Sequence, residues 1–172
     1  MDKTLICIII ICAAAVLTAC STQDAGRPTP DKSASEGVTE DIISGGVPKD
    51  GIPSVDDPKF TSVSETDLNP DDIVFGVAQN DTAKAYPRHI LVHHEIVNDE
   101  INGDNISVTY CPLTGTAMGF RRGNTTFGVS GKLVNSNLIM YDRATNSYFP
   151  QIKGAGITGD RRGERLDQFR VI

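Results

Sequence analysis

From residue 72 to residue 152, apolar and polar side chains alternate in short runs, and turn-forming residues separate these runs. Alternation with a period of two is typical of strands, because successive side chains of a strand point to opposite faces. A weaker helical pattern over residues 89–97 lacks capping residues. Four hairpins are predicted: residues 72–78 with 83–86, 91–101 with 105–111, 117–121 with 125–129, and 137–142 with 148–152.

These hairpins predict a mainly β fold, with α+β as its variant. The expected architecture is a twisted antiparallel sheet or a small sandwich built from hairpins, with at most a short helix. The roughly 110 residues that carry the pattern are enough for one modest hydrophobic core.

The first twenty residues follow a different pattern. Lys3 precedes an unbroken apolar run over residues 5–17, and small residues then lead to Cys20. This is the order of a secretory signal peptide, and residues 17–21 resemble a bacterial lipobox, whose cysteine is lipidated. The run is shorter than the roughly 20 apolar residues that span a bilayer. We therefore predict a signal peptide over residues 1–19 and lipidation of Cys20.

Composition separates a tether from a domain. Residues 21–58 are rich in Ser, Thr, Gly, Pro and Asp and almost lack aromatic residues. Such a segment buries too little apolar surface to offset the entropy cost of ordering it. We predict that the lipidated cysteine and a flexible tether span residues 20–58, and that a single β-rich domain spans residues 59–172. The expected location is the cell envelope, with the domain outside the cytoplasm.

Charge narrows the choice of partners. The formal net charge is −6 at pH 7, and the arginines form only isolated pairs, such as those at 121–122 and 161–162. A nucleic-acid-binding surface needs clustered Lys and Arg to neutralise phosphates. We expect the membrane as a partner through the lipid anchor, and a small-molecule substrate or a metal ion as further candidates. Nucleic acid is not expected.

One cysteine remains for chemistry. Cys7 and Cys12 leave with the signal peptide and Cys20 carries lipid, so Cys111 is alone in the mature chain. All three histidines lie within six residues, at positions 89, 93 and 94. An imidazolium beside a cysteine stabilises the thiolate, which is the nucleophilic form.

Hairpin geometry tests whether the two groups meet. If Asn102-Gly103 is a two-residue type I′ turn, paired residue numbers sum to 205, which places His94 opposite Cys111. A four-residue turn pairs Cys111 with Ile96 and leaves His94 one diagonal step away. A three-residue turn brings Glu95 or His93 to Cys111 instead.

The leading hypothesis is a thiol-dependent site with Cys111 as nucleophile and His94 as base. The turn after Cys111 carries two hydroxyls and a glycine, which could direct N–H groups at an anion. Whether the chain is an enzyme stays open, and the cofactor is unknown. The candidate binding or orienting residues are Glu95, Asn98, Thr114, Gly115, Thr116, Ser130 and Lys132.

Three other interpretations compete with this one. His94, Cys111 and Met118 offer soft ligands for copper or zinc, so the chain could bind or deliver a metal. Cys111 could equally be a buried hydrophobe and His94 a packing residue. The domain could also be a non-catalytic surface interaction module whose motifs serve only the fold.

Several motifs together resemble one protein family, the domain of unknown function 3179. The residues that carry the resemblance are Tyr86-Pro87, HEIVND at 94–99, VTYCPLTGTA at 108–117, FGVSGKL at 127–133 and NSNLIMYDR at 135–143. The resemblance implies no established activity. It does imply an exported or membrane-associated protein, in agreement with the lipobox.

The chain departs from the family pattern at three places. His93 stands where the family usually has tryptophan, so His94 is the matching histidine. Residues 148–151 replace a Ser-Leu-Trp-Ser-Gln-like stretch. Relatives usually continue past the equivalent of Leu166, so we expect a truncated member that lacks part of its sheet.

Overall fold

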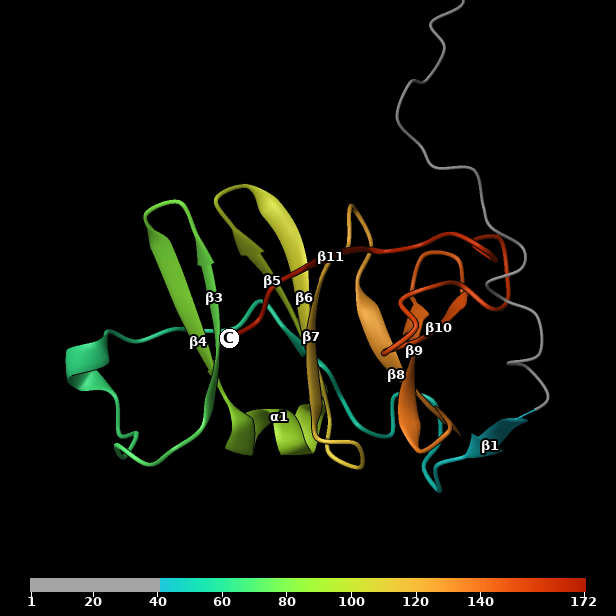
Figure 1. Cartoon of the computed structure of the whole chain (residues 1–172), viewed down its shortest axis with the longest axis horizontal. Helices are drawn as coiled ribbons and strands as arrows, with labels where there is room; N and C mark the ends of the chain where they lie inside the picture. The colour runs from blue at the N-terminus through green and yellow to red at the C-terminus, as the bar shows by residue number, and fades with distance from the viewer. Residues whose placement is uncertain (1–40) are drawn as a thin grey trace, which may run out of the picture.

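The computed structural model describes residues 41–172. The signal peptide, Cys20 and most of the predicted tether lie outside the described residues. The fold prediction is confirmed, because the domain is mainly β with antiparallel and mixed sheets and one short α-helix (Figure 1). The elements are β1 (Ile42–Ser44), β2 (Val55–Asp56), η3 (Val63–Glu65), β3 (Val74–Gln79), β4 (Thr82–Pro87), α1 (Arg88–His94), β5 (Ile96–Ile101), β6 (Asp104–Cys111), β7 (Thr116–Arg121), β8 (Phe127–Val134), β9 (Asn137–Asp142), β10 (Tyr148–Pro150) and β11 (Asp167–Phe169).

The strands form three sheets. A four-stranded sheet has the order β1-β8-β9-β10, a five-stranded sheet has the order β11-β7-β6-β5-β2, and β3 pairs with β4 alone. All pairs are antiparallel except β2 with β5. β1 and β2 belong to the segment predicted as tether, so the folded part extends N-terminally of residue 59. Average composition hides them because each strand contributes only one or two apolar residues.

The five-stranded sheet is the middle layer of the domain. One of its faces packs against the four-stranded sheet, and this core contains Ile96, Cys111 and Phe120. Its other face packs against the β3–β4 hairpin and α1, in a core that includes Tyr86 and Leu91. Strand alternation explains the division, because neighbouring residues of β5 and β6 point into different cores.

The β5–β6 hairpin confirms the predicted register. Asn102 and Gly103 form a two-residue turn with positive φ angles of 50° and 84°, as a type I′ turn requires. Ile101 pairs with Asp104 and Ile96 pairs with Thr109, so the paired numbers sum to 205. The strand itself begins at Ile96, five residues later than predicted.

A helix replaces the first part of the predicted strand over residues 91–101. α1 has no side-chain cap at its start, and it ends at His94, which is followed by Glu95 with a φ angle of 58°. The helix forms because it places one of its own residues, Leu91, in the core, where this side chain is completely buried. Burial of one leucine side chain stabilises a fold by about 1.5–3 kcal/mol, which outweighs the weak local helical signal.

The predicted hairpin of residues 117–121 with 125–129 is wrong. β7 pairs with β6 and β11, whereas β8 pairs with β9 and β1 in the other sheet. Residues 122–126 therefore cross between sheets. Phe127 is fully buried between the two sheets. Burial of this side chain favours the pairing of β8 with β9 over a pairing with β7.

Candidate functional site

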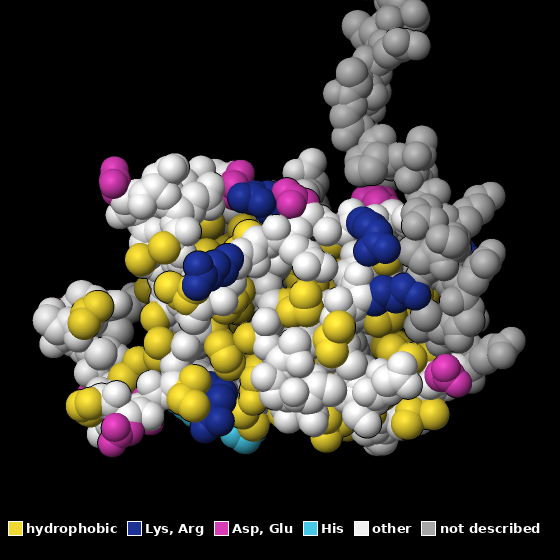
Figure 2. All heavy atoms as spheres, in the orientation of Figure 1, with side chains coloured by type: hydrophobic (Ala, Val, Ile, Leu, Met, Phe, Trp, Pro, Cys, Tyr) yellow, Lys and Arg dark blue, Asp and Glu magenta, His cyan; other side chains and the backbone are white. Residues whose placement is uncertain are grey.

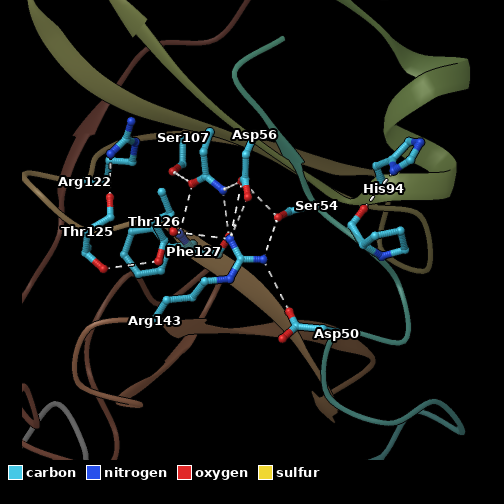
Figure 3. A network of polar contacts seen from close by, with 12 residues as sticks. Asp50, Ser54, Asp56, His94, Ser107, Arg122, Thr125, Thr126, Phe127 and Arg143 are labelled. Atoms are coloured by element: carbon cyan, nitrogen blue, oxygen red, sulfur yellow. Dashed lines mark hydrogen bonds and ion pairs between the residues drawn. The ribbon is translucent and has the colours of Figure 1, made fainter.

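His94 lies at the end of α1 and not on a strand. Its Nδ1 atom is 2.8 Å from the carbonyl oxygen of Pro53, in the segment that precedes β2 (Figure 3). The predicted strand pairing of His94 with Cys111 is therefore not formed. The positive φ of Glu95 breaks the strand before it reaches His94.

Cys111 is the last residue of β6, and its side chain faces the core between the two large sheets. The residue is only 1% exposed, and its Sγ atom lies 3.6 Å from the carbonyl oxygen of Ser136. The Cys111 thiol therefore donates to a backbone carbonyl from within the core.

Amide and hydroxyl groups surround the end of β6. Gln151 donates to the Thr109 hydroxyl and to the Thr116 carbonyl, at 3.0 Å in both cases. Asn137 donates to Gln151 at 2.8 Å and to the Thr114 hydroxyl at 3.3 Å. These bonds tie the β6–β7 turn to β9 and β10. The predicted anion-facing turn is exposed, and Gly115 supplies its positive φ of 63°.

The other candidate residues are dispersed. Asn98 and Ser130 are buried, and both are hydrogen-bonded within the sheets. Lys132 is exposed and pairs with Ser44 on β1.

Glu95 and Met118 are the remaining candidates. Burial raises the pKa of the Glu95 carboxyl. Met118 packs against the Cys111 core, and residues 41–172 contain no group of three or more His, Cys, Asp or Glu placed to hold a metal.

One polar cluster, which we call the clamp, fastens residues 50–56, which end with β2, to Arg143, the residue after β9. It consists of Asp50, Ser54, Asp56 and Arg143. The Arg143 guanidinium donates to Asp56 at 3.1 Å, to Ser54 at 2.9 Å and to Asp50 at 3.4 Å (Figure 3). Each of these groups has a partner, so the clamp has the character of a structural joint.

Asn98 connects the clamp to both large sheets. Its amide nitrogen donates to Asp56 at 2.7 Å and to the Phe127 carbonyl at 2.8 Å. Its amide oxygen accepts from the Ser107 hydroxyl at 2.7 Å and from the Phe127 N–H at 3.0 Å. Asn98 is 1% exposed, and both groups of its amide are hydrogen-bonded within the protein.

A large hollow lies on the opposite side of the five-stranded sheet, and we call it the cleft. It has a volume of about 1240 Å³. One side is β4, and the other is residues 57–72, here called the wall segment. Figure 2 shows apolar side chains over this part of the molecule. The main apolar lining residues are Phe60, Val63, Leu68, Val74, Ile90 and Ile172.

The floor of the cleft holds a paired charge. Lys84 donates to the two carboxylate oxygens of Asp99 at 2.8 and 3.0 Å, and the Tyr86 hydroxyl donates to the same carboxylate at 2.8 Å. Phe60 covers this group, with its ring 4.5 Å from the Lys84 Nζ and 5.6 Å from the Tyr86 ring. Burial, together with the bond to Asp99, raises the pKa of Tyr86. The polar floor is thus fully paired.

Sequence reasoning missed the cleft, although two signals point to it. Phe60, Val63 and Leu68 are apolar residues in an otherwise polar segment. Ala83 and Ala85 alternate with Lys84 and Tyr86, so neither face of β4 is continuously polar. The outer face of an antiparallel hairpin is normally polar when only water covers it.

Comparisons with known proteins give one match. A family model described as "Protein of unknown function (DUF3179)" covers residues 49–172, which is well over half of the chain. No curated protein and no solved structure matches. Within residues 41–172, no helix has the length and apolar character needed to cross a bilayer.

Proposed function

This chain belongs to the family described as "Protein of unknown function (DUF3179)", and we propose that its folded domain is an interaction module that binds an apolar partner in the cleft. The cleft is the observation that carries this proposal. A large apolar hollow with a few convergent polar groups is the usual form of a binding site. The size of about 1240 Å³ exceeds the roughly 300–1,000 Å³ of small-molecule pockets. A segment of a macromolecule therefore suits it better than a metabolite.

The apolar side chains of the wall segment support a binding role. Val63 is 93% exposed and Phe60 is 44% exposed, and both line the cleft. Exposed apolar groups that gather at one hollow mark interaction sites, whereas scattered ones need no explanation. The charged groups of the floor are already paired with each other, which favours binding over catalysis.

The module is held at the membrane by the lipid on Cys20, as the lipobox predicts. Replacing Cys20 by Ser should leave an unlipidated precursor that the lipoprotein peptidase does not cleave. Mass spectrometry of the membrane and soluble fractions measures this. A Cys20→Ser protein that is processed and membrane-bound like the parent would contradict the anchor.

The cleft is tested with an environment-sensitive apolar dye and the purified protein. Val63→Asp should weaken dye binding roughly tenfold, because loss of about 1.4 kcal/mol of apolar contact corresponds to that factor. Leu113→Asp is the matched control, since Leu113 is 67% exposed and lies on the β6–β7 turn, outside the cleft. Equal loss in both variants, or in neither, would contradict the proposal.

A thiol-dependent site at Cys111 is the second candidate. The observation that favours it is the ring of polar groups from Thr114, Thr116, Asn137 and Gln151 around the end of β6. The candidate base is still His94, which lies at the end of α1 and does not pair with Cys111 across the β5–β6 hairpin. The pH dependence of Cys111 alkylation tests the site. A pKa below the free-thiol value of about 8.5 supports it, and slow reaction at every pH assigns Cys111 to the core.

A further inference from the structure

β4 pairs with β3 on one side only, so its other edge has no neighbouring strand in the part of the chain that the structure describes. The alternation of bonded and non-bonded pairs along the hairpin shows which residues have backbone groups on that edge. The β3–β4 hairpin turns at Asn80-Asp81, so Gln79 and Thr82 form its closing hydrogen-bonded pair. Every second pair then bonds across the hairpin, and the N–H and C=O groups of the residues in between point outward. The bonds of Gly76 confirm this parity, because its N–H and C=O both bond to Ile172, at 2.6 and 3.0 Å.

The two outer edges of the hairpin differ. Ile172 bridges the β3 edge at Gly76. The β4 edge carries the outward groups of Ala83 and Ala85, which pair across the hairpin with Ala78 and Gly76 but donate and accept away from it. Among residues 41–172, no partner bonds to these two N–H and two C=O groups. Both alanines are exposed and line the cleft.

We infer that the cleft receives an extended peptide segment of a partner protein, which adds to β4 as a new strand beside Ala83 and Ala85. This inference rests on the proposed binding role of the cleft and names its ligand class. Strand addition uses backbone hydrogen bonds for affinity and pockets for alternate side chains for specificity. A helix satisfies its own backbone groups and would leave those of Ala83 and Ala85 unpaired.

The lining of the cleft suits a strand. A strand added to β4 lies about 4.8 Å from it and presents alternate side chains to the wall segment. Phe60, Val63 and Leu68 are placed to receive apolar ones. The small side chains of Ala83 and Ala85 leave the edge accessible. Pro87 has no N–H, so it limits the addition to the first part of β4.

The rim of the cleft sets the charge of the peptide. Glu65, Asp67 and Asp72 line the cleft, and Lys59 is the basic residue of the wall segment. Lys84 does not offset the acidic groups, because its charge is paired with Asp99. The rim is therefore net acidic, and it favours a segment that carries Lys or Arg beside its apolar residues.

The test uses the purified protein and a panel of labelled nine-residue peptides with apolar residues at alternate positions and Lys or Thr between them. Binding is measured by fluorescence anisotropy at low salt. At least one member should bind, and replacing its Lys by Glu should weaken binding several-fold. If no member binds, the inference is overturned.

Backbone methylation separates strand addition from simple apolar binding. Each binding peptide is methylated at alternate nitrogens in two sets, which keeps the side chains and removes one face of N–H groups. One set should lose about tenfold or more in affinity, and the other should keep it. If both sets bind equally to the protein, the inference that the peptide adds to β4 as a strand is overturned, whatever the affinity.

Two variants test the β4 edge. Ala85→Pro removes one outward N–H at an edge position that tolerates proline, and it should weaken the peptide several-fold more than the matched Ala85→Ser. If two copies of the chain pair through this edge instead, sedimentation should show a dimer that Ala85→Pro dissociates. That result would overturn the inference that a partner protein supplies the strand. If the dye binds at the cleft without any backbone-dependent peptide, only the strand inference fails. If neither binds, the proposed function fails with it.

Discussion

The clamp and the cleft use consecutive parts of the same segment in opposite ways. Residues 50–56 are fastened to the body by charged and polar bonds to Arg143 and Asn98. Residues 57–72 then leave the body and carry exposed apolar side chains around a hollow. In the clamp each polar group has a partner, whereas the cleft combines a paired floor with open backbone groups on β4. The difference separates structure from function: satisfied groups hold the fold, and unsatisfied ones are available to a ligand.

The largest expected effect comes from removing Asn98, which connects the clamp to both large sheets. Asn98→Ala removes four hydrogen bonds and leaves the N–H and C=O of Phe127 without their amide partner in a buried site. The free energy of unfolding should fall by about 2–4 kcal/mol, as measured by urea denaturation. Asn124→Ala, at an exposed turn, is the control and should change it by less than about 0.5 kcal/mol.

The next effect concerns the exposed end of the clamp. Arg143→Ala should lower the free energy of unfolding by about 1–2 kcal/mol, because its partners Asp50 and Asp56 are 43% and 48% exposed and water replaces the lost bonds. Hydrogen exchange over residues 49–56 should become faster in this variant. Unchanged exchange there would show that the clamp does not hold the segment.

A smaller effect is expected at the floor of the cleft. Tyr86→Phe removes the hydrogen bond to Asp99 but keeps the buried ring, and Asp99 keeps its two contacts with Lys84. The free energy of unfolding should fall by about 1 kcal/mol. Dye binding in the cleft should persist, because the apolar lining is intact. If dye binding falls together with the free energy of unfolding, the Tyr86 hydroxyl belongs to the binding surface.

The smallest effect is a pH dependence at Glu95, which belongs to neither region. Burial raises the pKa of this carboxyl above its ordinary value of 4.5. The folded state therefore binds the proton more tightly than the unfolded state, and stability falls as the pH rises from about 4.5 through the higher folded pKa. Glu95→Gln should be slightly more stable than the parent at pH 7 and equal to it below that window. Thermal unfolding at several pH values measures this difference.

The site followed the sequence only in part. The β5–β6 turn was predictable because Asn102-Gly103 is a strong local signal, and it fixed the position of Cys111 on β6. The position of His94 was not predictable, because burial of Leu91 places residues 88–94 in a helix and not in a strand. The clamp joins motifs more than 80 residues apart, so no local pattern reveals that Asp56 and Arg143 meet.

The sequence by itself determined the β class, the register of the central hairpin and the family, because alternation, turn chemistry and motifs are local properties of the chain. The signal peptide and the lipid at Cys20 remain predictions from the same kind of local pattern. The tertiary structure alone decided that residues 122–126 cross between sheets and that β4 keeps a free edge opposite the wall segment. Both depend on which distant strands compete for an edge and which side chains find a core. Those are free-energy differences of the whole fold.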